Sequence, residues 1–241
     1  MRRSAMLSNA AALSILVLLA AYPSRAETAD EQKPTCVDDA MLVFDASGSM
    51  AATDFPDGAP SRMDRVRQAL VKVLPAASQT RRLGLMVYGP GPNFNTCNNV
   101  DLRLPPTSNA GKRIMHEVER LRPAGRTPLT SSVKQAAEIL QHEHRPAVVV
   151  LLTDGQDTCG GDACRLAHDL KTLQPAITVH VIGYRLQSPS GAELPFVERC
   201  LADVTGGIYA TAETTEQLAA ALSETLGCPA VTSLPIDQPI R

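Results

Sequence analysis

Residues 41–49 read MLVFDASGS, an apolar run that ends at an aspartate and continues into two serines. A continuous apolar run is typical of a strand that is buried on both faces, as in a parallel sheet. Residues 147–155, AVVVLLTDG, repeat this arrangement and reach Asp154. Helical segments alternate with such strands along the chain. The pattern predicts an α/β fold, with a doubly wound, mostly parallel six-stranded sheet and helices on both faces.

The remaining elements follow from the spacing of apolar residues and from turn signals. A turn rich in Gly, Pro and Asn joins residues 83–88 to 100–104, so the second of these strands is predicted to be an antiparallel edge strand. Ser61 and Asp64 have the spacing of a helix N-terminal cap. Further strands are expected at 177–184 and 208–211, and further helices near 110–121, 129–141, 162–173, 198–204 and 215–226.

The first 26 residues have the composition of an export signal. Arg2 and Arg3 precede the apolar stretch 10–21, and small residues at 24 and 26 suit a signal peptidase. An uncleaved anchor is the alternative, but the stretch is short for a membrane span, which takes roughly 20 apolar residues. We expect cleavage after Ala26. The mature chain then has a linker at 27–35, one domain at 36–228, a flexible Pro-rich tail at 229–241 and no stable membrane span.

Composition argues against several classes of partner. Removing residues 1–26 takes away three arginines and no acidic residue, which changes the formal net charge from −2 to −5. An acidic chain of this kind is not suited to nucleic acid or to anionic membranes. The chain also contains no glycine-rich phosphate-binding motif, so a nucleotide is not expected.

All six cysteines follow the export signal. An even number of cysteines in an exported chain predicts three disulfides. A zinc site is the weaker interpretation, because four residues separate Cys159 from Cys164 and no histidine has a suitable spacing. The cysteines are Cys36, Cys97, Cys159, Cys164, Cys200 and Cys228.

Oxygen-bearing side chains gather where the predicted strands end. Asp45, Ser47 and Ser49 follow one strand, Asp154 follows another, and Thr127 lies in the loop GRTPL at 125–129. In doubly wound sheets, ligands bind outside the carboxyl ends of the strands. Carboxylates and hydroxyls are hard ligands that suit Mg²⁺, and Mn²⁺ or Ca²⁺ less specifically. The sequence therefore predicts a divalent metal site at this edge.

Other interpretations of these residues are weaker. The stretch DASGS alone could be a polar turn that caps a helix. A phosphatase with Asp45 as nucleophile would need an acid at position 47, where Ser47 stands. A serine hydrolase would need a histidine in these loops, and none is there. Asp54 and Asp57 are interpreted as ordinary turn residues. We therefore expect a protein that is not an enzyme.

Three separated motifs resemble those of von Willebrand factor A domains: DASGS at 45–49, GRTPL at 125–129 and LLTDG at 151–155. TCGGDAC at 158–164 and CLADVTGG at 200–207 are similar to segments of bacterial exported members. The resemblance covers residues 41–226 approximately. It implies a metal-ion-dependent adhesion site, and it implies that the protein is periplasmic or secreted.

The resemblance also implies roles for these residues. Ser47 and Ser49 would bind the ion directly, and Thr127 directly or through water. Asp45 and Asp154 would hold coordinating waters and orient the serines. A protein partner would then complete the coordination with an acidic side chain. The competing function is a scaffold domain whose ion only makes the loops rigid.

The same resemblance suggests how the cysteines pair. Several extracellular members join their domain ends, which implies Cys36 with Cys228. Cys159 and Cys164 could then close a short ring after Asp154, leaving Cys97 for Cys200. The alternative set joins Cys97 to Cys159 and Cys164 to Cys200.

Overall fold

A computed structural model describes residues 39–54, 58–92, 96–141, 144–186 and 196–227. The export signal, the linker at 27–35, the tail at 229–241, Cys36, Cys228 and Asp57 lie outside these ranges, so the predictions made for them stay predictions. Within the described ranges, no helix is both long enough and apolar enough to cross a membrane.

The centre of the fold is a six-stranded sheet with the strand order β3-β2-β1-β4-β5-β6. Every pairing is parallel except that of β2 with β3, which is antiparallel. The predicted fold class and the antiparallel edge strand are both confirmed. The strands are β1 (Asp39–Asp45), β2 (Arg82–Tyr88), β3 (Val100–Thr107), β4 (Ala147–Thr153), β5 (Ile177–Tyr184) and β6 (Tyr209–Ala212).

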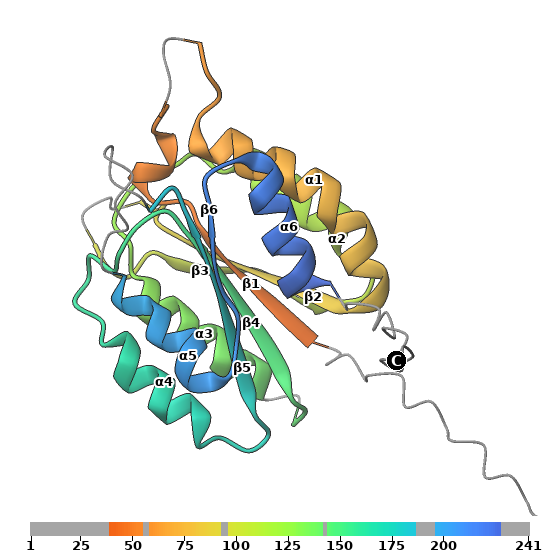
Figure 1. Ribbon diagram of the computed structural model, residues 1–241, viewed down its shortest axis with the longest axis vertical. Coiled ribbons are helices and arrows are strands. Elements are labelled where there is room, and N and C mark those ends of the chain that lie inside the picture. Colours follow the sequence, from red (N-terminus) through yellow and green to blue (C-terminus); the bar gives the residue numbers. More distant parts are fainter. Residues whose placement is uncertain (1–38, 55–57, 93–95, 142–143, 187–195, 228–241) are drawn as a thin grey trace, which may run out of the picture. The chain divides into compact units, whose positions relative to one another are not determined.

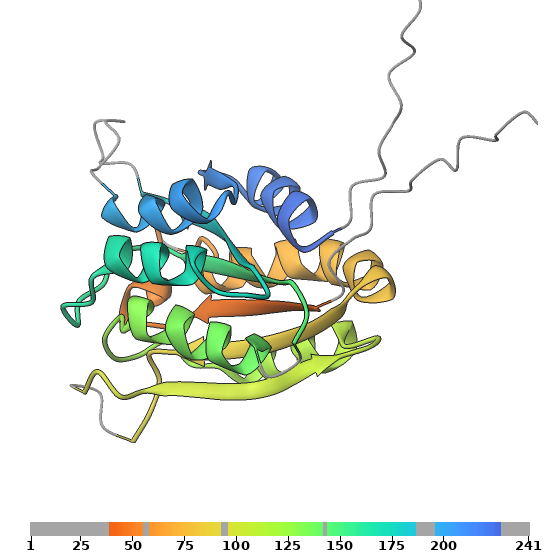
Figure 2. The same cartoon turned by 90° about the horizontal axis from the view of Figure 1, so that it is seen from below.

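Helices cover both faces of this sheet. One face carries α1 (Arg62–Thr80), α2 (Gly111–Arg120) and α6 (Thr215–Leu226), and the other carries α3 (Leu129–Gln141), α4 (Ala163–Lys171) and α5 (Cys200–Thr205). Figures 1 and 2 show these two layers with the sheet between them. Two short 3₁₀ helices, η1 (Gly48–Ala51) and η2 (Val197–Arg199), complete the described elements.

Each face of the sheet has its own apolar core, and alternate residues of β1 contribute to both. Leu42 and Phe44 pack with α1, α2 and α6, whereas Met41 and Val43 pack with α3, α4 and α5. All seven residues of β1 are buried. This explains why the strand is a continuous apolar run, because no side of it faces solvent.

The edge strand β3 continues three residues beyond its predicted end at 104. These residues include Pro105 and Pro106, and proline is tolerated in an edge strand, where one side of the backbone needs no partner. The Arg82 guanidinium donates to the Pro106 carbonyl (3.0 Å), which holds this part of β3 against β2.

The topology reverses direction at β1. From β1 the chain moves outward to β2 and β3, then returns to β4 on the other side of β1 and continues to β5 and β6. Ligand sites of open α/β sheets lie at such a reversal, beyond the carboxyl ends of the strands. The ends of β1 and β4 are therefore where a site is expected.

Candidate functional site

Residues 45–49, the motif turn, begin where β1 ends, and Asp45 fixes their position. Its carboxylate is fully buried. Oδ1 accepts a hydrogen bond from the Ser47 amide (2.8 Å), and Oδ2 accepts one from the Thr153 hydroxyl (2.7 Å) at the end of β4. Asp45 therefore joins the carboxyl ends of the two strands, and both of its oxygens are engaged within the protein.

The two serines of the motif turn lie side by side next to Asp154. The Ser47 and Ser49 hydroxyl oxygens are 3.0 Å apart, and the Ser49 hydroxyl donates to Asp154 Oδ1 (2.6 Å). Ser47 and Asp154 are buried, whereas Ser49 is exposed. The structure thus brings three of the predicted site residues together, in a cluster that solvent reaches from the side of Ser49.

Thr127 lies in a second loop, residues 122–128, which we call the threonine loop. This loop runs against the motif turn, because the Gly48 amide donates to the Gly125 carbonyl (3.2 Å) and the Ala124 amide donates to the Ala46 carbonyl (2.9 Å). Thr127 itself is buried. All five predicted site residues therefore lie on adjoining loops at the same edge of the sheet.

The end of β2 supports the motif turn from another side. The Ala46 amide donates to the Tyr88 carbonyl (3.0 Å), and Gly89 follows with a φ of 108°. A Cβ atom at position 89 would lie 2.6 Å from the Ser47 amide nitrogen. Only glycine fits here, since both the backbone angle and the contact with Ser47 exclude a side chain.

Arg62, the first residue of α1, binds two carboxylates at the site. Its Nη1 is 2.9 Å from Asp154 Oδ2, and its Nη2 is 2.6 Å from Asp54 Oδ1. Arg185 contacts the other oxygen of Asp54 (3.3 Å) and also Glu213 (3.2 Å). The interpretation of Asp54 as an ordinary turn residue is therefore incomplete, because it belongs to an ion-pair network next to the cluster.

The motifs do not point to Arg62, but its position in the sequence carries a signal. A positive charge in the first turn of a helix is unfavourable, because the N-terminal end of the helix dipole is itself positive. Arg62 follows the N-cap Ser61, whose predicted capping box with Asp64 is present. A basic residue at this position is understandable when nearby carboxylates compensate, as Asp54 and Asp154 do.

The electrostatic environment of Asp154 favours a nearby cation. Burial and then the negative charge of Asp45 raise the pKa of Asp154 to about 6, although the bonds from Ser49 and Arg62 oppose this shift. The pKa of Asp54 is lowered, because Arg62 and Arg185 outweigh the effect of burial. Ion pairs next to the cluster join Arg62 and Arg185 to Asp54, Asp154 and Glu213, and Asp45 adds its negative charge beside Asp154.

The geometry of the serine pair also fits a divalent ion. Ligands of Mg²⁺ lie at about 2.1 Å in an octahedron, so two adjacent ligands are about 3.0 Å apart. The Ser47 and Ser49 hydroxyl oxygens, which share a hydrogen bond, have this separation. With the carboxylates of Asp45 and Asp154 beside it, the donor set suits a hard divalent cation rather than a neutral ligand.

Other chemistries find less support in the described part of the chain. No three His, Cys, Asp or Glu side chains lie together there in a way that could hold a metal ion. His180 instead has a structural role, since its Nδ1 accepts a hydrogen bond from the Ile208 amide (2.8 Å).

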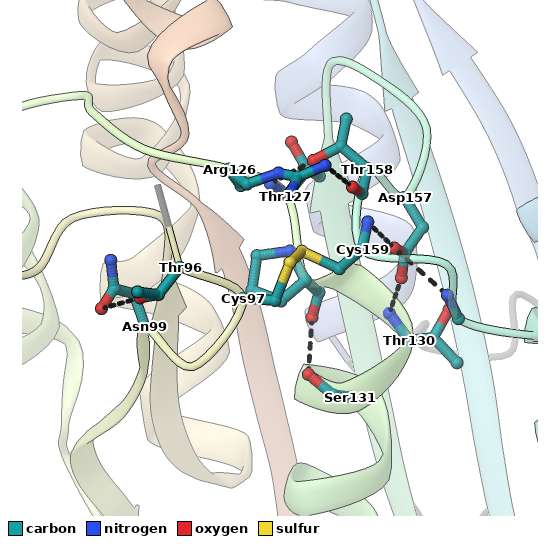
Figure 3. Close-up of a disulfide and its surroundings, with 12 residues drawn as sticks. Thr96, Cys97, Asn99, Arg126, Thr127, Thr130, Ser131, Asp157, Thr158 and Cys159 are labelled. Atoms are coloured by element: carbon teal, nitrogen blue, oxygen red, sulfur yellow. Dashed lines mark hydrogen bonds between the residues drawn. A yellow bond between two sulfur atoms is a disulfide. The ribbon is translucent and has the colours of Figure 1, made fainter. Parts of the chain in front are cut away.

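The disulfides differ from the preferred prediction. Cys97 pairs with Cys159 and Cys164 pairs with Cys200, so the pairings Cys159–Cys164 and Cys97–Cys200 are wrong and the alternative set is right. Asp157 accounts for the difference. Its carboxylate accepts bonds from the Cys159 and Thr130 amides (2.6 and 2.8 Å), which hold this loop beside α3, where Cys97 reaches it (Figure 3). Cys164 lies in α4, which packs against α5 and its Cys200.

Comparisons with known proteins agree with this architecture. The uncharacterized protein YwmC of Bacillus subtilis is 28% identical over 181 residues, which cover 72% of this chain and 76% of YwmC. An aerotolerance-related membrane protein from Bacteroides fragilis has a TM-score of 0.59 at 20% identity, covering 78% of this chain and 98% of that chain. A von Willebrand factor type A structure from Catenulispora acidiphila has a TM-score of 0.58 at 18% identity, and the match covers 79% of this chain and 42% of that chain.

The family model of the von Willebrand factor type A domain matches residues 40–156. This range begins in β1, includes the motif turn and the threonine loop, and ends just after Asp154. The chain therefore contains a von Willebrand factor type A domain.

Proposed function

We propose that this protein binds a partner protein through a divalent cation held at the carboxyl edge of its sheet. One observation carries the proposal: two serine hydroxyls 3.0 Å apart lie next to the buried Asp154, and one of them is exposed. Domains of this family commonly mediate protein interactions. An exposed ligand leaves room for a group from another molecule.

In this proposal each side chain of the site has its own role. Ser47 and Ser49 hold the ion, with Thr127 as a further ligand directly or through water. Asp154 orients the Ser49 hydroxyl, and Asp45 fixes the turn through the Ser47 amide. Mg²⁺ suits this set best, with Mn²⁺ and Ca²⁺ as alternatives. When bound, the cation supplies a positive position that an acidic side chain of the partner can complete.

The first test measures cation binding by calorimetry with Mg²⁺ and Mn²⁺. Ser47→Ala and Thr127→Ala should each weaken binding by about tenfold or more, as loss of groups around a metal does. The matched control is Ser131→Ala in α3, which removes a hydroxyl that donates to the Pro128 carbonyl (3.1 Å). Equal affinities for all four proteins would contradict the site.

The second test concerns the partner. Crosslinking in the native compartment, followed by identification of the captured protein, should give a partner that is lost with chelator and with Asp45→Ala. The protein could also bind the cation and still capture its partner in chelator and in the Asp45→Ala variant. That result would support the scaffold function, in which the ion only makes the loops rigid.

We also propose that the protein is exported. Two disulfides among the described residues are typical of an oxidising compartment. The test is N-terminal sequencing of the protein recovered from cells, which should begin at Glu27 if the signal is cleaved after Ala26. A mature chain that still begins at Met1 would contradict cleavage.

A further inference from the structure

Four loops are joined in a closed ring of contacts, and one of them carries the serine pair. They are the motif turn, the threonine loop, residues 154–162 (the aspartate loop) and the connection between β2 and β3, of which residues 89–92 and 96–99 are described. The first contact of the ring joins the motif turn to the threonine loop, through the Gly48 amide and the Gly125 carbonyl.

The second contact joins the threonine loop to the aspartate loop, and it centres on Thr158. The Thr127 amide donates to the Thr158 hydroxyl (2.9 Å), and the Thr158 amide donates back to the Thr127 carbonyl (3.0 Å). Arg126 adds a further bond from its guanidinium to the Thr158 carbonyl (Figure 3). The backbone of Thr127 is thus fixed on both sides by one residue.

The third contact is covalent. The disulfide between Cys97 and Cys159 joins the aspartate loop to the β2–β3 connection, and Cys159 directly follows Thr158. The β2–β3 connection then returns to the motif turn: Asn99 and Gly89 exchange two hydrogen bonds (3.1 and 3.2 Å), and Gly89 packs against Ser47. The disulfide therefore closes the ring, and the other contacts in it are hydrogen bonds or packing.

We infer that Thr158 and the Cys97–Cys159 disulfide are positioning groups for the ion site, which hold Thr127 at a fixed distance from the serines. The inference rests on the proposed function, since it assigns a purpose to Thr127. The physical reason is preorganisation: a loop that is already held in its binding geometry loses less conformational freedom when the ligand binds. Groups that orient metal ligands typically change metal affinity about 10- to 100-fold when they are removed.

The chain offers matched variants for a test. Thr158→Val keeps the shape of the side chain and removes the hydroxyl acceptor, whereas Thr158→Ser keeps the acceptor. Cys97→Ser with Cys159→Ser opens the ring. Cys164→Ser with Cys200→Ser removes the second disulfide of the described residues, which joins α4 to α5.

Two readouts are needed, with circular dichroism as a check on folding. Mn²⁺ affinity, followed by its electron paramagnetic resonance signal, should fall about tenfold or more in Thr158→Val and in the Cys97/Cys159 variant. It should stay at the wild-type value in Thr158→Ser and in the Cys164/Cys200 variant. In chelator, hydrogen exchange of the Thr127 amide should become faster in the first two variants only.

The outcomes separate this inference from the proposed function. If the wild-type protein binds no divalent cation, the proposed function fails, and the exchange of the Thr127 amide alone decides whether Thr158 positions the loop. If the wild-type protein binds Mn²⁺ and Thr158→Val binds it equally well with unchanged exchange, the inference is overturned. Thr158→Val also keeps the test decisive if the Cys97/Cys159 variant does not fold.

Discussion

Gly89 occupies a position where a single methyl group should disturb the site. Because a Cβ atom there would lie 2.6 Å from the Ser47 amide nitrogen, Gly89→Ala should move the motif turn and separate the two serine hydroxyls. We expect divalent-cation affinity to fall by about tenfold or more, measured by calorimetry.

The effect of backbone strain at a positive φ has to be separated from the effect of the contact between a Cβ atom at position 89 and Ser47. Gly206 also has a positive φ, of 79°, but a Cβ atom there would meet no atom within 4 Å. Gly206→Ala should therefore reduce the free energy of unfolding by about 1 kcal/mol through strain alone and leave cation affinity unchanged. A similar loss of affinity in both variants would show that general strain, rather than displacement of Ser47, is responsible.

Arg62 should matter most when no cation is present. Arg62→Ala leaves the buried Asp154 next to Asp45 without its positive partner. In chelator, we expect the free energy of unfolding to fall by about 1–3 kcal/mol, the usual cost of leaving a buried polar group unpaired. Saturating Mg²⁺ should recover part of this loss, because it adds positive charge at the same carboxylates. Urea unfolding in the two conditions measures both effects.

The matched control is an exposed ion pair. Lys134 and Glu138 are both more than half exposed at 3.8 Å, so Lys134→Ala should change the free energy of unfolding by less than about 0.5 kcal/mol. An equally small effect for Arg62→Ala would mean that solvent, rather than the guanidinium, compensates Asp154.

The residues of the site differ in how far the sequence predicts them. The motifs identify Ser47, Ser49 and Asp154 because all three lie shortly after the end of a strand, and strand ends are visible as breaks in apolar runs. Arg62 and Thr158 act on residues that are 92 and 31 positions away. Such contacts depend on the tertiary arrangement, which a local pattern does not contain.

At the scale of single elements, His180 links β5 to the start of β6. Burial and then the positive charge of Arg81 lower the pKa of His180 from 6.5 to about 4. Between these values the unfolded chain binds a proton that the folded chain does not, so the free energy of unfolding should decrease as the pH falls from about 6.5 to about 4. His180→Asn keeps an acceptor for the Ile208 amide and should remove this contribution.

The measurement compares urea unfolding of wild-type and His180→Asn protein at several pH values in chelator. Asp154 contributes with the opposite sign, because its raised pKa favours the folded state as the pH falls through about 6. Both proteins contain Asp154, so its contribution cancels in the difference. Parallel curves for the two proteins would show that His180 does not titrate differently on folding.

The elements themselves were largely predictable, because strands buried on both faces and amphipathic helices have distinct apolar patterns. The predicted limits of β4 and β5 agree with the structure, and β1 extends two residues further at its start. The pairing of the cysteines was not predictable, since it depends on how the aspartate loop turns. The amide of Asp157 donates to the Glu198 side chain (2.7 Å), a contact across 41 residues that sets this turn.

At the scale of the whole molecule, stability and ion binding should be separable. Both apolar cores lie between the sheet and its helices, and the core side chains do not include the serines of the motif turn. Chelator should therefore leave the protein folded. A cation at about a hundred times its Kd should add about 2.7 kcal/mol to the free energy of unfolding by mass action.

Thermal unfolding with increasing Mg²⁺ tests this expectation. The midpoint should rise with concentration in wild-type protein and should need about tenfold or more Mg²⁺ for the same rise in Ser47→Ala, with similar midpoints for both proteins in chelator. Unfolding of the wild-type protein by chelator alone would contradict the independence of the fold.

The two edges of the sheet determine by which route another protein can attach. An exposed edge invites an incoming strand that extends the sheet through main-chain hydrogen bonds. The outer strand β3 carries Pro105 and Pro106, which have no amide hydrogen to offer, and the opposite edge β6 has only four residues. Strand addition, a common way of assembling extracellular fibres, is therefore disfavoured along both sides. This agrees with the proposed attachment at the carboxyl ends of the strands, where one molecule would meet another through side chains.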